Sequence, residues 1–79
     1  MKPIKQADGV GALTPRQREV LLLIARGLSN SEIEVELGIT RATCRSHITA
    51  LLARLGARDR AQLVIAAYEA GLISPRRGA

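Results

Sequence analysis

Cysteine, histidine and aromatic residues are scarce in this 79-residue chain, which contains one of each and neither phenylalanine nor tryptophan. A single cysteine, Cys44, excludes an intramolecular disulfide. Cys44 and His47 cannot by themselves supply the four nitrogen and sulfur ligands of a structural zinc ion, so no metal or other cofactor is expected. Because Tyr68 is the only aromatic residue, the sequence argues against a module that stacks single-stranded nucleic acid on aromatic side chains.

Long apolar runs are also missing. Runs such as Val20–Ala25 are far too short to span a bilayer, and no apolar segment follows Met1 and Lys2 as it would in a signal peptide. The chain is 47% hydrophobic and carries 12 Lys and Arg against 7 Asp and Glu, a net charge of +5. These values favour one small folded domain with a polyanionic partner. Low cysteine content without an export signal favours a cytoplasmic location.

Four segments each begin with a helix-capping residue and end with a glycine, which predicts four helices. The caps are Thr14, Ser29, Thr40 and Asp59, and the glycines are Gly27, Gly38, Gly56 and Gly71. No strand-like alternation competes, so the predicted fold class is all-α. Residues 1–12 are interpreted as a flexible arm or linker, residues 13–73 as the folded domain and residues 74–79 as a basic tail. The start at Met1 favours a free-standing protein, whereas the linker-like residues 1–12 favour one domain of a larger protein.

The second and third helices form the informative pair. They are joined by residues 38–40, a glycine, an isoleucine and a capping threonine, which is the layout of a helix-turn-helix. The second helix of that motif enters the major groove of duplex DNA. The charges agree with this assignment, because residues 39–56 contain three arginines and no acidic residue, whereas the preceding helix carries three glutamates. The sequence therefore predicts that the third helix, about residues 41–55, reads DNA.

The outward face of the third helix follows from its period. If residues 44, 48, 51, 52 and 55 are buried, the residues that face outward are Arg41, Ala42, Arg45, Ser46 and Thr49. Arg45 could bind a guanine through two hydrogen bonds, and Ser46 and Thr49 could contact bases or phosphates. We expect base reading by Arg41, Arg45, Ser46 and Thr49. The residues placed for phosphate contacts are Asn30, Thr40, Thr43 and Arg54.

The fourth helix offers a surface for self-association. With Leu63, Val64, Ala67 and Tyr68 taken as core-facing, other positions of this helix are left toward its flanks. An exposed Ile65 among small residues could form a two-fold contact between copies. The residues predicted to line this homodimer interface are Ala61, Gln62, Ile65, Ala66 and Glu69.

The segment from Leu13 to Ile73 resembles the LuxR/FixJ-type DNA-binding domain of bacterial transcription regulators. The resemblance is carried by the runs LTPRQREVL, ARGLSNSEI and TRATCRSH and by the R-L-G-x-x-x-R pattern of residues 54–60. It implies a four-helix domain, sequence-specific binding of duplex DNA and frequent dimerisation through the fourth helix. By position, Arg45, Ser46 and Thr49 match base-facing sites. Positions that contact the DNA backbone or brace the reading helix are matched by Thr43, His47, Arg54 and Arg60.

Three positions depart from the family pattern. Gln17 stands where the family usually has glutamate, which preserves the capping geometry but removes a charge. Glu34 replaces a small residue at the closest approach of the second and third helices, so its side chain must extend outward or widen the crossing. Cys44 replaces a buried valine, a modest change in volume, and is expected to act as a small core residue.

The sequence thus predicts a transcription regulator that binds duplex DNA as a dimer, with RNA polymerase as a further candidate partner. One alternative is a sigma-factor-like promoter-reading helix-turn-helix, although residues 58–73 match the LuxR type. A second alternative is a protein-interaction module built on a helix-turn-helix that no longer binds DNA, for which Gln17 and Glu34 are the best support. No enzyme activity is expected, because no catalytic set of side chains is present.

Overall fold

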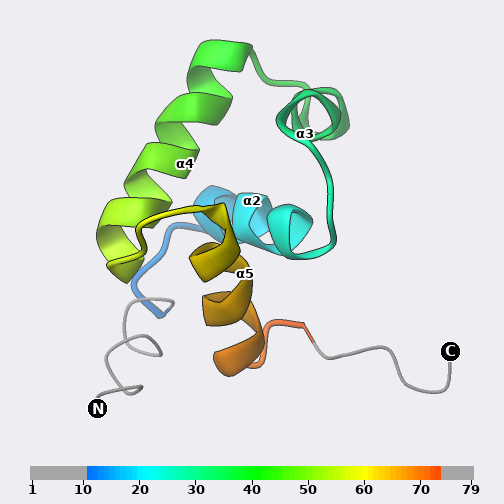
Figure 1. Cartoon of the computed structure of the whole chain (residues 1–79). Helices are drawn as coiled ribbons and strands as arrows, with labels where there is room; N and C mark the ends of the chain where they lie inside the picture. The colour runs from blue at the N-terminus through cyan, green and yellow to red at the C-terminus, as the bar shows by residue number, and fades with distance from the viewer. Residues whose placement is uncertain (1–10, 74–79) are drawn as a thin grey trace, which may run out of the picture.

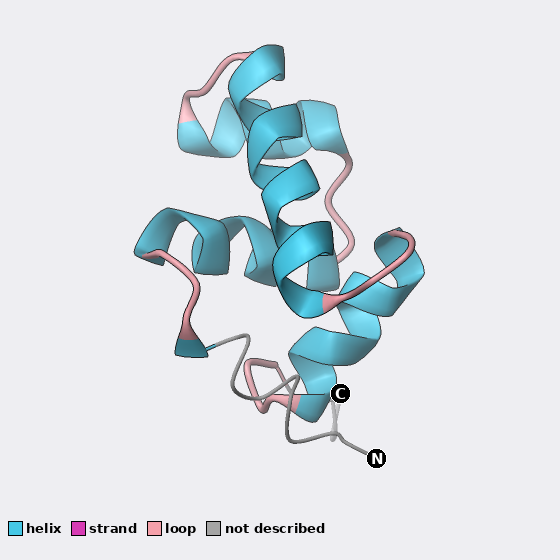
Figure 2. Ribbon diagram, turned by 90° about the vertical axis from the view of Figure 1, so that its left-hand side faces the viewer, coloured by secondary structure: helices cyan, strands magenta, loops and turns pink. Residues whose placement is uncertain are grey.

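The computed structural model describes residues 11–73, and in this range the chain is built from helices joined by short loops (Figures 1 and 2). The helices are α2 (Pro15–Ala25), α3 (Asn30–Leu37), α4 (Arg41–Leu55) and α5 (Arg60–Glu69). No strand occurs between residues 11 and 73. The predicted all-α, four-helix fold is confirmed. Most of the predicted arm (1–12) and the whole predicted tail (74–79) lie outside the described residues.

Reciprocal side-chain caps fix the starts of α2 and α3. At α2, the Thr14 hydroxyl accepts a hydrogen bond from the backbone N–H of Gln17 at 3.1 Å. The side-chain oxygen of Gln17 accepts one from the backbone N–H of Thr14 at 3.0 Å. At α3, Ser29 and Glu32 form the same pair of bonds at 3.2 and 2.8 Å. Both pairs are capping boxes, and each satisfies backbone donors that a helix start leaves unpaired.

The cap of α5 departs from this pattern. The Asp59 carboxylate accepts a hydrogen bond from the backbone N–H of Gln62 at 3.0 Å, as expected of a capping residue. The Gln62 side chain, however, accepts from the amide of Arg58 at 2.7 Å, one residue before the cap. The reciprocal bond of a capping box is here displaced toward the loop between α4 and α5, and Gln62 ties that loop to the helix.

A left-handed glycine forms the turn between α3 and α4. Gly38 has φ 65° and ψ 41°, a conformation that glycine adopts without the penalty of a side chain. The next amide, that of Ile39, then donates to the Glu34 carbonyl at 3.0 Å. Thr40 follows with extended backbone and caps α4. The predicted helix-turn-helix is therefore present over α3 and α4.

The helices enclose one apolar core in which α2 contacts each of the other three (Figure 1). The largest fully buried side chains come from all four helices and are Val20, Leu21, Ile24, Ile33, Cys44, Leu51 and Leu63. No polar or charged side chain is buried among residues 11–73. None of their helices is both long enough and apolar enough to cross a membrane. The core thus packs α3 and α4 together through apolar side chains.

The buried stripe of α5 differs from the predicted one at two positions. Ala66, expected toward the flank and at the dimer interface, is 1% exposed, whereas Tyr68, expected in the core, is 38% exposed. Both predictions are wrong. The stripe passes through Leu63, Ala66 and Ala67, and α5 packs against α2. A tyrosine in the core would also need a partner for its hydroxyl.

Candidate nucleic-acid interface

One face of α4 is covered with short or basic side chains that lie in solvent. All five residues that the helical period predicted to face outward are exposed: Arg41, Ala42, Arg45, Ser46 and Thr49. On the opposite face Cys44, Leu51 and Leu55 are buried. Because the buried face is fixed by the core, the exposed face is presented as a rigid surface. The face has the composition that a DNA groove can accept, since arginine and small hydroxyl side chains bond to base edges.

A pair of threonines organises the first turn of α4. The Thr40 hydroxyl accepts from the Thr43 amide at 3.1 Å and donates to the Thr43 hydroxyl at 3.0 Å. The Thr43 oxygen is therefore an acceptor for Thr40, which leaves its own hydroxyl hydrogen available to an outside acceptor. Both residues are exposed. This turn thus combines a free hydroxyl donor with the partial positive charge of a helix N-terminus, two features that favour a phosphate.

The positive charge of α4 is spread along its length, with Arg41 and Arg45 near the start and Arg54 near the end. All three are exposed. Arg54 also donates to the carbonyl of Ala12 at 3.3 Å, which connects the end of α4 to the segment before α2. The helix contains no acidic residue, so these charges are not offset within it.

Asn30 and Arg60, predicted separately as phosphate contacts, lie together. One guanidinium nitrogen of Arg60 donates to the Asn30 side-chain oxygen at 2.6 Å, and the other donates to the Leu28 carbonyl at 2.5 Å. The two bonds tie the start of α5 to the loop and first residue of α3. Asn30 uses its oxygen here, so its amide group remains the donor for an outside partner.

Cys44 links α4 to the start of α3. Its sulfur lies 4.0 Å from the carbonyl oxygen of Asn30, and the side chain is 1% exposed. Burial raises the pKa of the Cys44 thiol, and the nearby Glu34 carboxylate raises it further, while Arg60 opposes the rise. The thiol is therefore neutral near neutral pH and fills space in the core, as the sequence predicted. His47, one turn along, is half-buried.

Glu34, which stands where the family pattern has a small residue, is half-buried. Its carboxylate makes no hydrogen bond or ion pair with residues 11–73. Within the same range, no group of three or more His, Cys, Asp or Glu side chains is placed to hold a metal ion.

The predicted dimer surface lies on α5. Ala61, Ile65 and Glu69 are exposed and Gln62 is half-buried. Ile65 is 52% exposed, so about half of this large aliphatic side chain lies in solvent. With Gln62 and Glu69 it lines a depression of about 300 Å³ that continues to Leu55, Gly56 and Ala57. Ala66 is buried and takes no part in this surface.

Comparison with known proteins decides the family. Residues 11–67 match the family described as bacterial regulatory proteins, luxR family. The chain belongs to the LuxR family. It is 44% identical over 69 residues to the response regulator protein VraR of Staphylococcus aureus strains Mu3 and NCTC 8325 and of Staphylococcus epidermidis strain RP62A. The match covers 87% of this chain but 33% of each relative, so the chain spans about a third of their length.

This LuxR-family domain is a helix-turn-helix domain of the kind that binds DNA in transcription regulation. Sequence reasoning found the exposed face of α4 but missed two contacts, those of Arg54 with Ala12 and of Arg60 with Leu28. Both join an arginine to a backbone carbonyl more than thirty residues away. The resemblance named both arginines as positions for backbone contacts or bracing, but a backbone acceptor leaves no trace in residue type, so the carbonyls that they bind have no sequence signal.

Proposed function

We propose that this LuxR-family domain binds duplex DNA in a sequence-specific way by inserting α4 into the major groove. The observation that carries the proposal is the exposed face of α4, where basic and small polar side chains cover a helix without a single acid. Arg41, Arg45, Ser46 and Thr49 are the proposed base-reading residues. Arginine supplies two parallel donors for guanine, and the two hydroxyl side chains bond to either bases or phosphates.

Backbone anchoring is proposed for residues around this face. The free hydroxyl of Thr43 and the start of α4 favour a phosphate, and Arg54 adds charge at the far end of the helix. The complete proposed set is Asn30, Thr40, Thr43, His47, Arg54 and Arg60. Asn30 and Arg60 are hydrogen-bonded to each other, so each can contact a phosphate only through N–H groups that this bond does not use.

A homodimer on DNA is proposed to form through α5. One module of this size makes few base contacts, so two copies on paired half-sites supply the specificity that one lacks. Ala61, Gln62, Ile65 and Glu69 are the proposed contact residues, and the support is the exposure of Ile65 beside a depression on the same helix.

The cellular role proposed for the domain is that of a response regulator output domain in the cytoplasm of a bacterium. Its support is the similarity to proteins named response regulator protein VraR, of which the chain matches about a third. RNA polymerase stays a proposed further partner. Family membership favours this role over a sigma-factor-like reader, and we propose no catalytic step.

Fluorescence anisotropy with labelled duplexes tests the binding proposal. Affinity should fall steeply with salt, with a slope of log K against log salt concentration of about −0.9 for each phosphate neutralised. A single target duplex, found by selection from a random library, should bind more tightly than scrambled duplexes at every salt concentration. A flat salt response, or equal affinity for all duplexes, would contradict the proposal.

Ile65→Glu tests the dimer. The substitution should weaken binding to a duplex with two half-sites, where the dimer contact adds affinity. Its affinity for a duplex with a single half-site should stay within about twofold of that of a charge-matched control variant. Arg16→Gln is that control, because it lowers the net charge by the same single unit at an exposed residue of α2 outside the proposed contacts. Equal two-site binding by both variants would show that α5 does not carry the contact.

A further inference from the structure

Val35 is an unusually exposed apolar residue on a helix that otherwise carries acidic side chains. It is 84% exposed, more than the other two exposed large hydrophobic residues of the described chain, Ile65 and Tyr68. A single exposed aliphatic side chain is common on protein surfaces. Val35 differs because it borders a hollow with a second apolar side chain, Leu28. The exposed valine is thus part of a surface feature.

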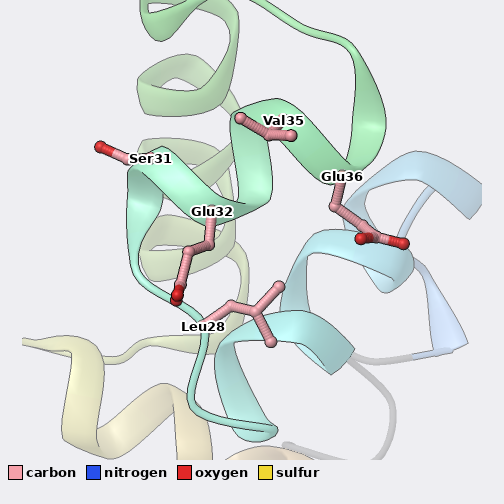
Figure 3. A pocket seen from close by; sticks show the side chains of 5 residues that line it. All are labelled: Leu28, Ser31, Glu32, Val35 and Glu36. Carbon is pink, nitrogen blue, oxygen red and sulfur yellow. The ribbon is translucent and has the colours of Figure 1, made fainter.

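The groove, defined by Leu28, Ser31, Glu32, Val35 and Glu36, has a volume of about 450 Å³ and is open to solvent. Figure 3 shows Val35 on α3 at the top and Leu28 on the preceding loop at the bottom, with Glu32 to the left and Glu36 to the right. The volume lies within the range of roughly 300–1,000 Å³ typical of ligand sites. An apolar patch with a polar rim is the usual appearance of a protein interaction site.

The rim of the groove carries negative charge with little internal compensation. Glu36 makes no hydrogen bond or ion pair with residues 11–73. One oxygen of Glu32 accepts from the Ser29 amide at 2.8 Å, which leaves its other oxygen to solvent. The two residues lie one turn apart on α3, so their carboxylates act on the same surface. Such a rim repels the phosphates of DNA and attracts cationic side chains.

We propose that this groove docks a basic segment of another protein. An aliphatic or aromatic side chain of that segment enters between Leu28 and Val35, and lysine or arginine residues beside it contact Glu32 and Glu36. Charge complementarity selects the partner and speeds its association. A groove lined by only five residues predicts a weak and transient complex. None of the groove residues belongs to the exposed face of α4, so the proposal is independent of the DNA-binding one.

The probe is a random peptide library displayed on phage and selected on the immobilised domain. The enriched peptides are then synthesised, and their affinity for the domain is measured by fluorescence anisotropy. They should combine lysine or arginine with a large apolar residue. Glu36→Lys should weaken their binding by about tenfold, and Val35→Ala should weaken it severalfold. Glu19→Lys, the same charge change on an exposed residue of α2 outside the groove, should leave their affinity within about twofold.

Both groove variants should keep their thermal stability, so a loss of peptide binding does not report misfolding. Val35 is almost fully exposed, and alanine is the better helix former. A lysine at position 36 lies in the last turn of α3, where a positive charge is favourable. Circular dichroism melts of each variant provide this check.

Three results would overturn the proposal. One is a selection that enriches no basic and apolar peptides. Another is a set of enriched peptides that bind Glu36→Lys and Val35→Ala as tightly as the unchanged domain. The third is self-association in sedimentation experiments that both groove variants abolish, since the occupant would then be a second copy of this chain. Because no DNA is present, each result is separable from a failure of DNA binding.

Discussion

The guanidinium of Arg60, at the first position of α5, donates to the side-chain oxygen of Asn30, at the first position of α3, over 2.6 Å. Its second nitrogen donates to the Leu28 carbonyl. The helix proposed for dimerisation is therefore bonded directly to the start of the helix-turn-helix. This contact gives the small domain a polar connection between two helices that are thirty residues apart in sequence.

Removing that connection should destabilise the fold. Arg60→Ala deletes two charge-assisted hydrogen bonds from a half-buried residue, and we expect a loss of about 1–2 kcal/mol in the free energy of unfolding. Arg60→Lys should recover only part of this, because an ammonium cannot form the forked pair of bonds. Urea denaturation measures both. The control is Arg58→Ala, which removes an exposed arginine two residues away, and equal losses at both positions would contradict the role of Arg60.

The cap of α4 should contribute measurably to stability. Thr40→Ala removes the hydroxyl that accepts from the Thr43 amide, and the expected cost is about 1 kcal/mol. Thr40→Ser keeps the hydroxyl and should restore most of it. Thermal melts followed by circular dichroism distinguish the two variants. If alanine and serine give the same melting temperature, the cap does not hold the start of the helix.

The Cys44 thiol should make stability depend on pH at the alkaline end. Its pKa in the folded state is raised above the ordinary value of 9.0, so the folded protein holds this proton more tightly than the unfolded chain. The stabilising contribution is fully present below that ordinary value and is lost as the pH rises through the folded-state pKa. Urea unfolding of the unchanged protein and of Cys44→Val, compared over this range, isolates the effect. The difference in unfolding free energy between them should change with pH only at the alkaline end, and parallel curves would refute the assignment.

Glu34→Ala should leave thermal stability unchanged or raise it. The carboxylate has no bonding partner among residues 11–73, it is half-buried, and alanine has the higher helix propensity. Glu36→Ala is the matched control, since it removes an exposed glutamate from the same helix. A clear drop in melting temperature for Glu34→Ala alone would mean that Glu34 makes a needed contact.

The sequence carries the information for the helices because their ends depend on local chemistry. Thr14 with Gln17, and Ser29 with Glu32, bond within one turn, so residue type at fixed spacing is sufficient. The rotation of α5 depends instead on how it meets α2. Both the predicted stripe through Tyr68 and the observed stripe through Ala66 have helical spacing, and only packing distinguishes them.

The candidate site likewise has features that the sequence predicts and features that it does not. The exposed face of α4 follows from the period of its buried residues, so Arg45 and Ser46 could be placed from sequence. The bond of Arg60 to the Leu28 carbonyl could not, because its acceptor is backbone. The groove beside Val35 depends on the approach of a loop residue to α3 and likewise has no local signature.

The most direct test of the account is the effect of Arg45→Ala on DNA sequence preference. The unchanged protein and Arg45→Ala are each used to select duplexes from a random library. The affinity of each protein for the duplex that the unchanged protein selects is then measured by anisotropy. Arg16→Ala is the control, since it removes an arginine from α2, and all three proteins should unfold at similar temperatures. We predict that Arg45→Ala costs about 1–3 kcal/mol on the selected duplex and relaxes the preference at a single base pair. If Arg45→Ala binds and selects like the unchanged protein, α4 does not read DNA through this face.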